Sequence, residues 1–297
     1  MIQKIFKWGI GTMVALLVVW WLNVPFLESQ NDDSSIIVTS TPILEPLILQ
    51  MLGPDTNVVS LVDRGALSKT VSLSDKKIAA LNSADVIIWH GQGADPYFDV
   101  AKPHIPKQAK VIVISDIMTK YEKKWPVHYW MSPISWNKMV HYMQRQLKLI
   151  FPNRRSEINV RKMAYTKDIY ALHQVVKTSV DTFTRNQKII ATNHPSFGPF
   201  ANLYGFELVV FDLDGPLDEA QLDQMVSTLR QKNITTFHPN ESIPDSGIDA
   251  LVNAAINQGW QLSIGKPLFS LNLDAKGSGV DTYIDMMAFN VRSIVDG

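Results

Sequence analysis

Two stretches of alternating strand and helix signals lie on either side of a long helical stretch, and this order limits the folds open to the chain. In the first stretch, apolar runs such as SIIVTST and ADVIIWHG alternate with segments of helical spacing. In the second, KIIAT and FELVVFD begin a similar alternation. Such alternation predicts mainly parallel sheets flanked by helices and joined by right-handed crossovers.

The middle stretch reads as almost wholly helical, with a break at Phe151 and Pro152. In the segment 157–183, apolar residues recur at helical spacing, which predicts one helix long enough to span about 40 Å. We therefore predict an α/β protein of two lobes joined by one long bridging helix. The predicted division is 35–134 for the N-terminal lobe, 135–185 for the helical bridge and 186–297 for the C-terminal lobe.

The first 27 residues differ from the rest of the chain. Lys4 and Lys7 precede an unbroken apolar run from Trp8 to Trp21, close to the roughly 20 residues that a membrane helix needs. Bulky residues stand where a cleaved signal peptide usually has small ones. We predict an uncleaved membrane anchor over 1–27, a linker over 28–34 and an extracytoplasmic location for the remainder, because the lysines favour the cytoplasmic side. A cleaved signal and a buried core helix are the alternatives.

Composition excludes several classes of function. The chain has no cysteine, so disulfides, thiolate metal sites, cysteine nucleophiles and a lipid-modified cysteine are ruled out. Lys and Arg total 28, as do Asp and Glu, and no basic stripe indicates a nucleic-acid partner. We find no phosphate-binding Walker loop and no G-x-S-x-G nucleophile motif. The sequence therefore favours a binding protein over an enzyme.

Polar residues at the ends of predicted strands suggest where a ligand would bind. His90 and His194 each follow an apolar strand, His128 lies in a loop before the helical stretch, and Asp281 begins the last helix. Open parallel sheets bind ligands outside the carboxyl ends of their strands. His128, His194 and Asp281 together offer two imidazoles and a carboxylate, a set that suits a divalent transition metal. Residue types alone leave open a second interpretation, in which His194 and Asp281 cap helices.

Four motifs, in order along about 260 residues, resemble those of the cluster A-I substrate-binding proteins of ABC metal importers. HGQGADPYFD is similar to N-G-x-G-L/F-E-P-F/W, and HYWMSP to H-x-W-L/M-D-P. ATNHPSFGPFANLYGF resembles T-x-H-x-A-F-x-Y-F/L-x-x-x-Y-G-F. DTYIDMMAFNVRSIV resembles the closing motif with its aspartate.

The resemblance implies two α/β lobes bridged by one rigid helix and a divalent metal bound between them. It matches His128, His194 and Asp281 to three of the family's four metal ligands. It also implies an ABC permease as the partner, zinc or manganese as the metal, and a receptor rather than an enzyme. We expect a monomer that binds zinc, with manganese as the alternative.

The chain departs from the family pattern at the first ligand. The segment VDRGALSKTVSLSD contains no histidine, and Ser68 or Lys69 occupies the place where the family has one. His90 replaces the family's asparagine before G-x-G, and Ser132 replaces an aspartate. His90 at a strand end could supply the missing imidazole, could act behind the ligands, or could lie at the surface. The site would otherwise keep an open position.

Two other functions stay open at this point. A degenerate relative would serve as a non-transport solute-binding, interaction or adhesion module, or as a metal buffer. A metallohydrolase would use an open coordination position for catalysis. The presence or absence of a fourth protein ligand, at residues 63–70 or at His90, separates these from a receptor.

Overall fold

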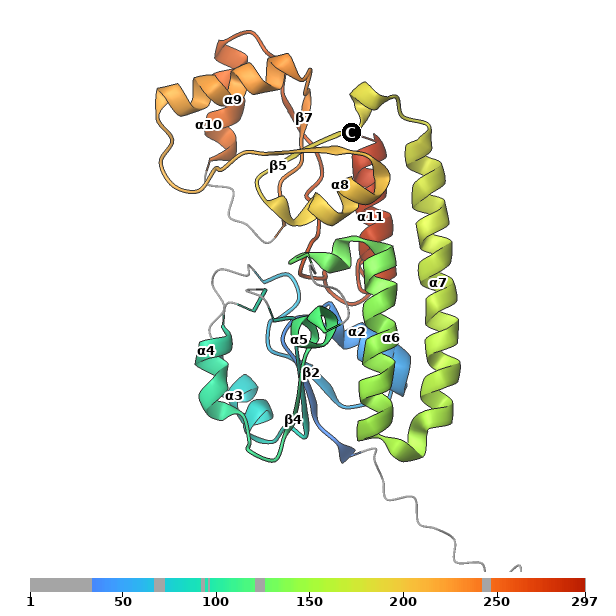
Figure 1. Ribbon diagram of the computed structural model, residues 1–297. Helices are drawn as coiled ribbons and strands as arrows, with labels where there is room; N and C mark the ends of the chain where they lie inside the picture. Colours follow the sequence, from blue (N-terminus) through green and yellow to red (C-terminus); the bar gives the residue numbers. More distant parts are fainter. Residues whose placement is uncertain are drawn as a thin grey trace, which may run out of the picture. The chain divides into compact units, whose positions relative to one another are not determined.

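A computed structural model describes most of the chain beyond the N-terminal segment (Figure 1). The described residues are 34–66, 73–91, 94–95, 97–120, 126–241 and 247–296. The predicted anchor, nearly all of the linker, and Ser68 and Lys69 lie outside these ranges. In the part of the chain that is described, no helix is both long and apolar enough to cross a membrane. The anchor over 1–27 therefore stays a prediction.

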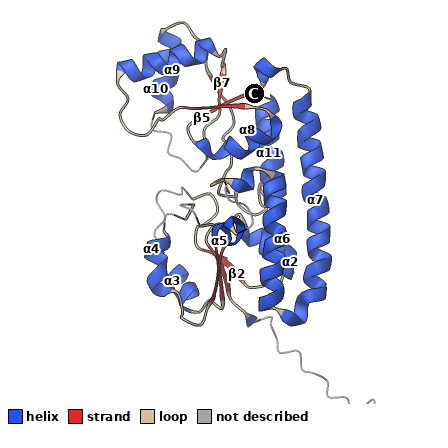
Figure 2. Ribbon diagram, viewed as in Figure 1, coloured by secondary structure: helices blue, strands red, loops and turns tan. Residues whose placement is uncertain are grey.

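The N-terminal lobe is built on four parallel strands in the order β2-β1-β3-β4. Helices α3 and α4 lie on one side of this sheet and α6 (Pro133–Ile150) on the other (Figures 1 and 2). The strands are β1 (Ile37–Thr39), β2 (Val58–Ser60), β3 (Val86–Trp89) and β4 (Lys110–Val113), and the helices are α2 (Leu44–Leu52), α3 (Asp75–Asn82), α4 (Phe98–Ala101) and α5 (Ile114–Thr119). Because the strand order reverses between β1 and β3, the carboxyl ends of these two strands form the edge at which such sheets bind ligands.

Two helices connect the lobes. Helix α6 runs over Pro133–Ile150, and after the turn that contains Pro152 helix α7 runs over Arg155–Asp181. Helix α7 packs against α2, α6 and α11, and Ile169, Leu172 and Val176 on its inner face are buried. The long bridging helix predicted from apolar spacing is confirmed, with its start two residues earlier than the predicted segment.

The C-terminal lobe contains two short parallel pairs, β5 with β6 and β7 with β8. The amide of His238, at the end of β7, donates to the carbonyl of Ala191 in β5, so the two pairs lie side by side. The strands are β5 (Ile189–Thr192), β6 (Glu207–Val210), β7 (Thr236–Phe237) and β8 (Ser263–Ile264), and the helices are α8 (Gly198–Tyr204), α9 (Glu219–Gln231), α10 (Ile248–Asn257) and α11 (Tyr283–Asp296). The predicted α/β class with parallel sheets is thereby confirmed.

One hydrophobic core runs through both lobes and the helices between them. Trp136 of α6 stacks on Tyr283 of α11 with ring centroids 4.4 Å apart, and its indole nitrogen donates to Tyr165 of α7 at 3.0 Å. All three side chains are buried. A core shared in this way holds the loops of the two lobes at a fixed separation, which is what a site built from both lobes requires. The exact lobe boundaries remain a prediction.

Candidate metal site

The structure brings His128 and His194 together from opposite lobes. His128 precedes the short helix η4 (Tyr129–Met131), and His194 lies between β5 and the short helix η7 (Pro195–Phe197). Their ring centroids are 5.2 Å apart and the rings meet edge to face. Pro195 begins the helical turn after His194, where its missing N–H costs nothing. The strand-to-helix junction therefore places the His194 imidazole beside that of His128.

The electrostatics of this pair favour metal ligation. Burial, and then the neighbouring His194, lower the pKa of His128 to about 4. At neutral pH the imidazole of His128 is thus uncharged and keeps a lone pair. Metal ligation needs this neutral form. The His128 and His194 rings, one edge to the face of the other, are a suitable start for a site that binds a divalent transition metal.

His90, the candidate for the missing imidazole, is 1% exposed at the end of β3. Its Nε2 lies 2.8 Å from the hydroxyl of Thr41, and its Nδ1 lies 3.0 Å from the hydroxyl of Tyr129. Burial, followed by the proximity of His128, lowers the pKa of His90 to about 3. His90 is therefore a neutral ring with both nitrogens in contact with hydroxyl groups of the protein.

Trp130 lies against both His90 and His128. Its ring centroid is 4.6 Å from that of His90 and 5.5 Å from that of His128. The side chain is 1% exposed, and its indole nitrogen donates to the carbonyl of Ser270 in the C-terminal lobe. Trp130 therefore connects the surroundings of the two histidines and also links the two lobes.

Sequence reasoning missed Thr41 and Tyr129 as partners of His90. Tyr129 directly follows His128 in HYWMSP, and Thr41 follows the first strand in SIIVTST. Polar residues at the carboxyl ends of neighbouring parallel strands were a signal that could have placed Thr41 beside His90. No local pattern could have paired His90 with Tyr129, because 39 residues separate them.

Asp281 has a different environment. Its carboxylate accepts hydrogen bonds from the backbone amides of Gly277, at 2.6 Å, and Gly279, at 3.0 Å. Both glycines have a φ of +85°, a conformation that glycine adopts without strain. These amides, that of Gly277 first, lower the pKa of the Asp281 carboxyl, and the residue is partly exposed. In this structure the carboxylate therefore binds backbone amides of the loop to which Asp281 belongs.

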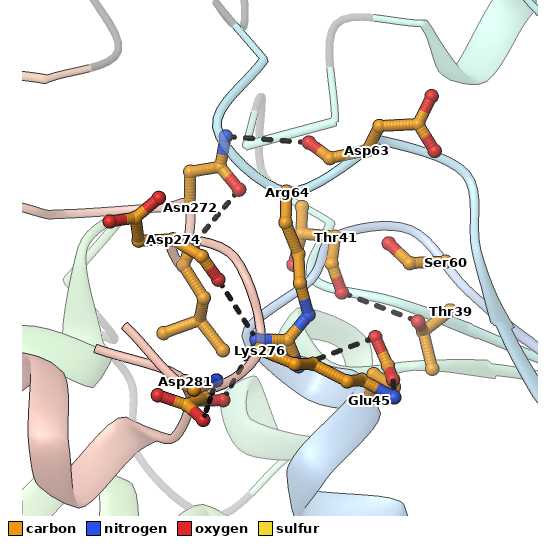
Figure 3. A network of polar contacts seen from close by, with 12 residues as sticks. Thr39, Thr41, Glu45, Ser60, Asp63, Arg64, Asn272, Asp274, Lys276 and Asp281 are labelled. Atoms are coloured by element: carbon orange, nitrogen blue, oxygen red, sulfur yellow. Dashed lines mark hydrogen bonds and ion pairs between the residues drawn. The ribbon is translucent and has the colours of Figure 1, made fainter. Parts of the chain in front are cut away.

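The loop that carries Asp281 is attached to the N-terminal lobe through Arg64 (Figure 3). The Arg64 guanidinium donates to the backbone carbonyl of Asp281 at 2.9 Å and to that of Asp274 at 3.3 Å. It also forms an ion pair with Glu45 of α2 at 3.5 Å, and Lys276 pairs with the same carboxylate at 3.1 Å. Arg64 belongs to the segment in which the resemblance led us to expect a histidine.

Of the four predicted ligands, the structure places His128 and His194 ring to ring. The His90 ring packs against Trp130 and contacts Thr41 and Tyr129. The Asp281 carboxylate accepts hydrogen bonds from backbone amides of its own loop. Within the described residues, no group of three or more His, Cys, Asp or Glu side chains is arranged to hold a metal ion. Segments 67–72 and 121–125 lie outside the residues that the structure describes.

Comparisons with known proteins give a consistent picture. Residues 37–297 match the model of a family described as ZnuA, "Zinc-uptake complex component A periplasmic". The zinc-binding protein TroA of Treponema pallidum is 21% identical over 277 residues, 90% of each chain. The manganese-binding lipoprotein MntA of Bacillus subtilis is 23% identical over 252 residues, 82% of each chain.

Solved structures agree on the fold. The periplasmic zinc-binding protein TroA of T. pallidum superimposes with a TM-score of 0.79 at 20% identity, covering 88% of this chain and 98% of that one. A manganese-bound periplasmic metal-binding protein of Candidatus Liberibacter asiaticus gives 0.75 at 17% identity, with the same coverage. The predicted two-lobed fold with its long helix is confirmed by this likeness.

Proposed function

Because the chain belongs to the ZnuA family of periplasmic zinc-uptake components, we propose that it captures a divalent transition metal between its lobes and delivers it to the permease of an ABC importer. The observation that carries this proposal is the His128–His194 pair, with ring centroids 5.2 Å apart. Each lobe supplies one ring. A metal bound there would have donors from both lobes.

The metal that we propose is zinc. Relatives are named for zinc, manganese and iron, so the names support a divalent transition metal without selecting one. Neutral imidazoles are good zinc ligands, whereas carboxylate-rich sites suit manganese. The two imidazoles on the crevice therefore favour zinc, with manganese as the competing cargo.

We propose His128 and His194 as the central ligands and Asp281 as a third. Asp281 would have to exchange the amides of Gly277 and Gly279 for the metal. Because the residue is partly exposed, water can solvate the released amides, and the exchange is feasible. For His90 to be the fourth ligand, one ring nitrogen would have to leave Thr41 or Tyr129, and a different role for it is argued below.

We also propose that the chain works outside the cytoplasm as a monomer held at the membrane by residues 1–27. The family description "periplasmic" supports the location. The apolar run after Lys4 and Lys7 supports the anchor. Binding rather than catalysis is the proposed activity, in keeping with a family of uptake components.

A non-transport relative is the second candidate. It is favoured by one observation, namely that no three metal donors are grouped within the described residues. Such a protein would keep the fold and bind metal weakly or not at all. The two candidates differ in a quantity that can be measured directly, the metal affinity of the purified protein.

The test is zinc-dependent thermal stabilisation of the domain that follows residue 34. A ligand at 100 times its dissociation constant adds about 2.7 kcal/mol to the free energy of unfolding. We expect His128→Ala and His194→Ala to lose this stabilisation, because each removes half of the pair. His141→Ala, at an exposed position on α6, is the matched control and should keep it. Unchanged stabilisation in both crevice variants, or none in the wild type, would contradict the proposal.

A further inference from the structure

His90 connects three segments that are far apart in the sequence. Its Nε2 contacts Thr41, in the turn between β1 and α2, and its Nδ1 contacts Tyr129 of η4. Thr41, His90 and Tyr129 are each at most 2% exposed. A neutral imidazole can satisfy two hydroxyls at once, since one ring nitrogen donates and the other accepts. The ring therefore closes a buried hydrogen-bonded chain.

This chain ends beside a proposed ligand. Tyr129 is the residue after His128, so a hydroxyl held by His90 restrains the backbone that carries the His128 ring. Trp130 gives a second route, because its ring packs against His90 at 4.6 Å and against His128 at 5.5 Å. Two contacts of different kinds thus transmit the position of His90 to His128.

The same contacts argue against direct ligation. A ring nitrogen that turned to a metal would give up its buried contact with the Thr41 or the Tyr129 hydroxyl, which is unfavourable. The His90 ring is also packed against Trp130, with centroids 4.6 Å apart. The partly exposed Asp281 faces no comparable obstacle.

We propose that His90 is a positioning residue, which fixes the His128 imidazole for metal capture through Tyr129 and Trp130 and does not itself bind the metal. The inference rests on the proposed metal-binding function and deepens it. It assigns to this chain a partner of His128 that acts behind the ligand, as hydrogen-bonded neighbours of metal ligands commonly do.

Two substitutions separate the nitrogens of His90. The amide of asparagine reaches the place of Nδ1, so His90→Asn keeps a polar contact with Tyr129 and loses the one with Thr41. The amide of glutamine reaches the place of Nε2, so His90→Gln keeps Thr41 and loses Tyr129. Tyr129→Phe removes the same contact from the other side with little change in volume.

The experiment is a zinc titration in competition with a chelating dye. We expect His90→Gln and Tyr129→Phe to weaken zinc binding by about tenfold or more, and His90→Asn to lose distinctly less. In the copper-loaded protein, the nitrogen hyperfine pattern in the electron paramagnetic resonance spectrum should be the same for the wild type and His90→Asn. A merely structural role of His90 would not predict this rescue by one amide and failure of the other.

The opposite results would overturn the inference. If His90 were a ligand, Tyr129→Phe would free a ring nitrogen and tighten zinc binding, and His90→Asn and His90→Gln would be equally weak. A nitrogen lost from the copper spectrum of His90→Asn would have the same meaning. If His90→Gln does not fold, the zinc affinity of Tyr129→Phe decides between a positioning role and direct ligation. Zinc binding by the wild type that is lost in His128→Ala shows that the proposed function holds, so a failure confined to the His90 and Tyr129 variants concerns this inference alone.

Discussion

The surroundings of His90 and the loop of Asp281 each present one metal donor, and they hold it in opposite ways. His90 is 1% exposed and contacts two side-chain hydroxyls from distant parts of the N-terminal lobe. Asp281 is partly exposed, and its carboxylate contacts two backbone amides of its own loop. Both donors are thus occupied by protein partners, and residue type alone does not distinguish them.

What distinguishes them is the consequence of changing partners. At Asp281, water can replace the carboxylate on the amides of Gly277 and Gly279, so the side chain can turn toward a metal at a small net cost. At His90, the hydroxyls of Thr41 and Tyr129 are buried, and each would lose its contact with the ring, which is unfavourable. A donor near solvent can become a ligand when a metal binds, whereas a buried donor stabilises the structure around the site.

The largest effect that tests this comparison is the stability of His90→Ala without metal. The substitution removes two buried contacts with hydroxyl groups and leaves a cavity against Trp130, so we expect the free energy of unfolding to fall by about 4 kcal/mol. Urea denaturation followed by tryptophan fluorescence measures it, with His141→Ala as the control. A loss below about 1 kcal/mol would mean that the His90 contacts contribute little and would break the contrast with Asp281.

Asp95 gives a smaller effect in the same buried region. It is 7% exposed, its carboxylate accepts from the amide of Gly91 at 2.6 Å, and burial raises its pKa from 3.8 to about 6. Between these values the folded carboxyl keeps a proton that the unfolded chain has released. Its contribution to stability is therefore complete below pH 3.8 and is lost as the pH rises through 6.

The expected result is a pH-dependent gain for Asp95→Asn, because the amide cannot ionise. The variant should gain stability over the wild type between pH 4 and pH 6 and hold a gain of about 2 kcal/mol above that range. Urea denaturation at a series of pH values measures the difference. If the difference in unfolding free energy between Asp95→Asn and the wild type did not change over this pH range, the buried region around Asp95 would tolerate a negative charge as well as the loop of Asp281 does.

The fold was more predictable from the sequence than the site. Apolar spacing in 157–183 predicted the long helix, and apolar runs followed by polar residues placed His90 and His194 at strand ends, because such patterns reflect which face a segment buries. The contacts of His90 depend on residues 49 and 39 positions away. The state of Asp281 depends on two glycines with positive φ. Periodicity encodes neither, so the sequence could name candidate donors but could not say which were already engaged.

The smallest effect on stability is expected at Asp281. In Asp281→Ala the backbone carbonyl that accepts from Arg64 remains, so the loop keeps its attachment to the N-terminal lobe. The substitution removes the two amide contacts and the attraction between the carboxylate and Arg64, and water can take the place of the carboxylate on the amides. We expect an unfolding midpoint close to that of the wild type without metal, together with weaker zinc binding, since a proposed ligand is gone. Gly279→Ala is the informative companion, because a side chain at a φ of +85° strains the loop while leaving the carboxylate in place. If Asp281→Ala destabilised the metal-free protein as much as His90→Ala does, the carboxylate would be a structural element of the loop, and its recruitment by a metal would become as unfavourable as that of His90.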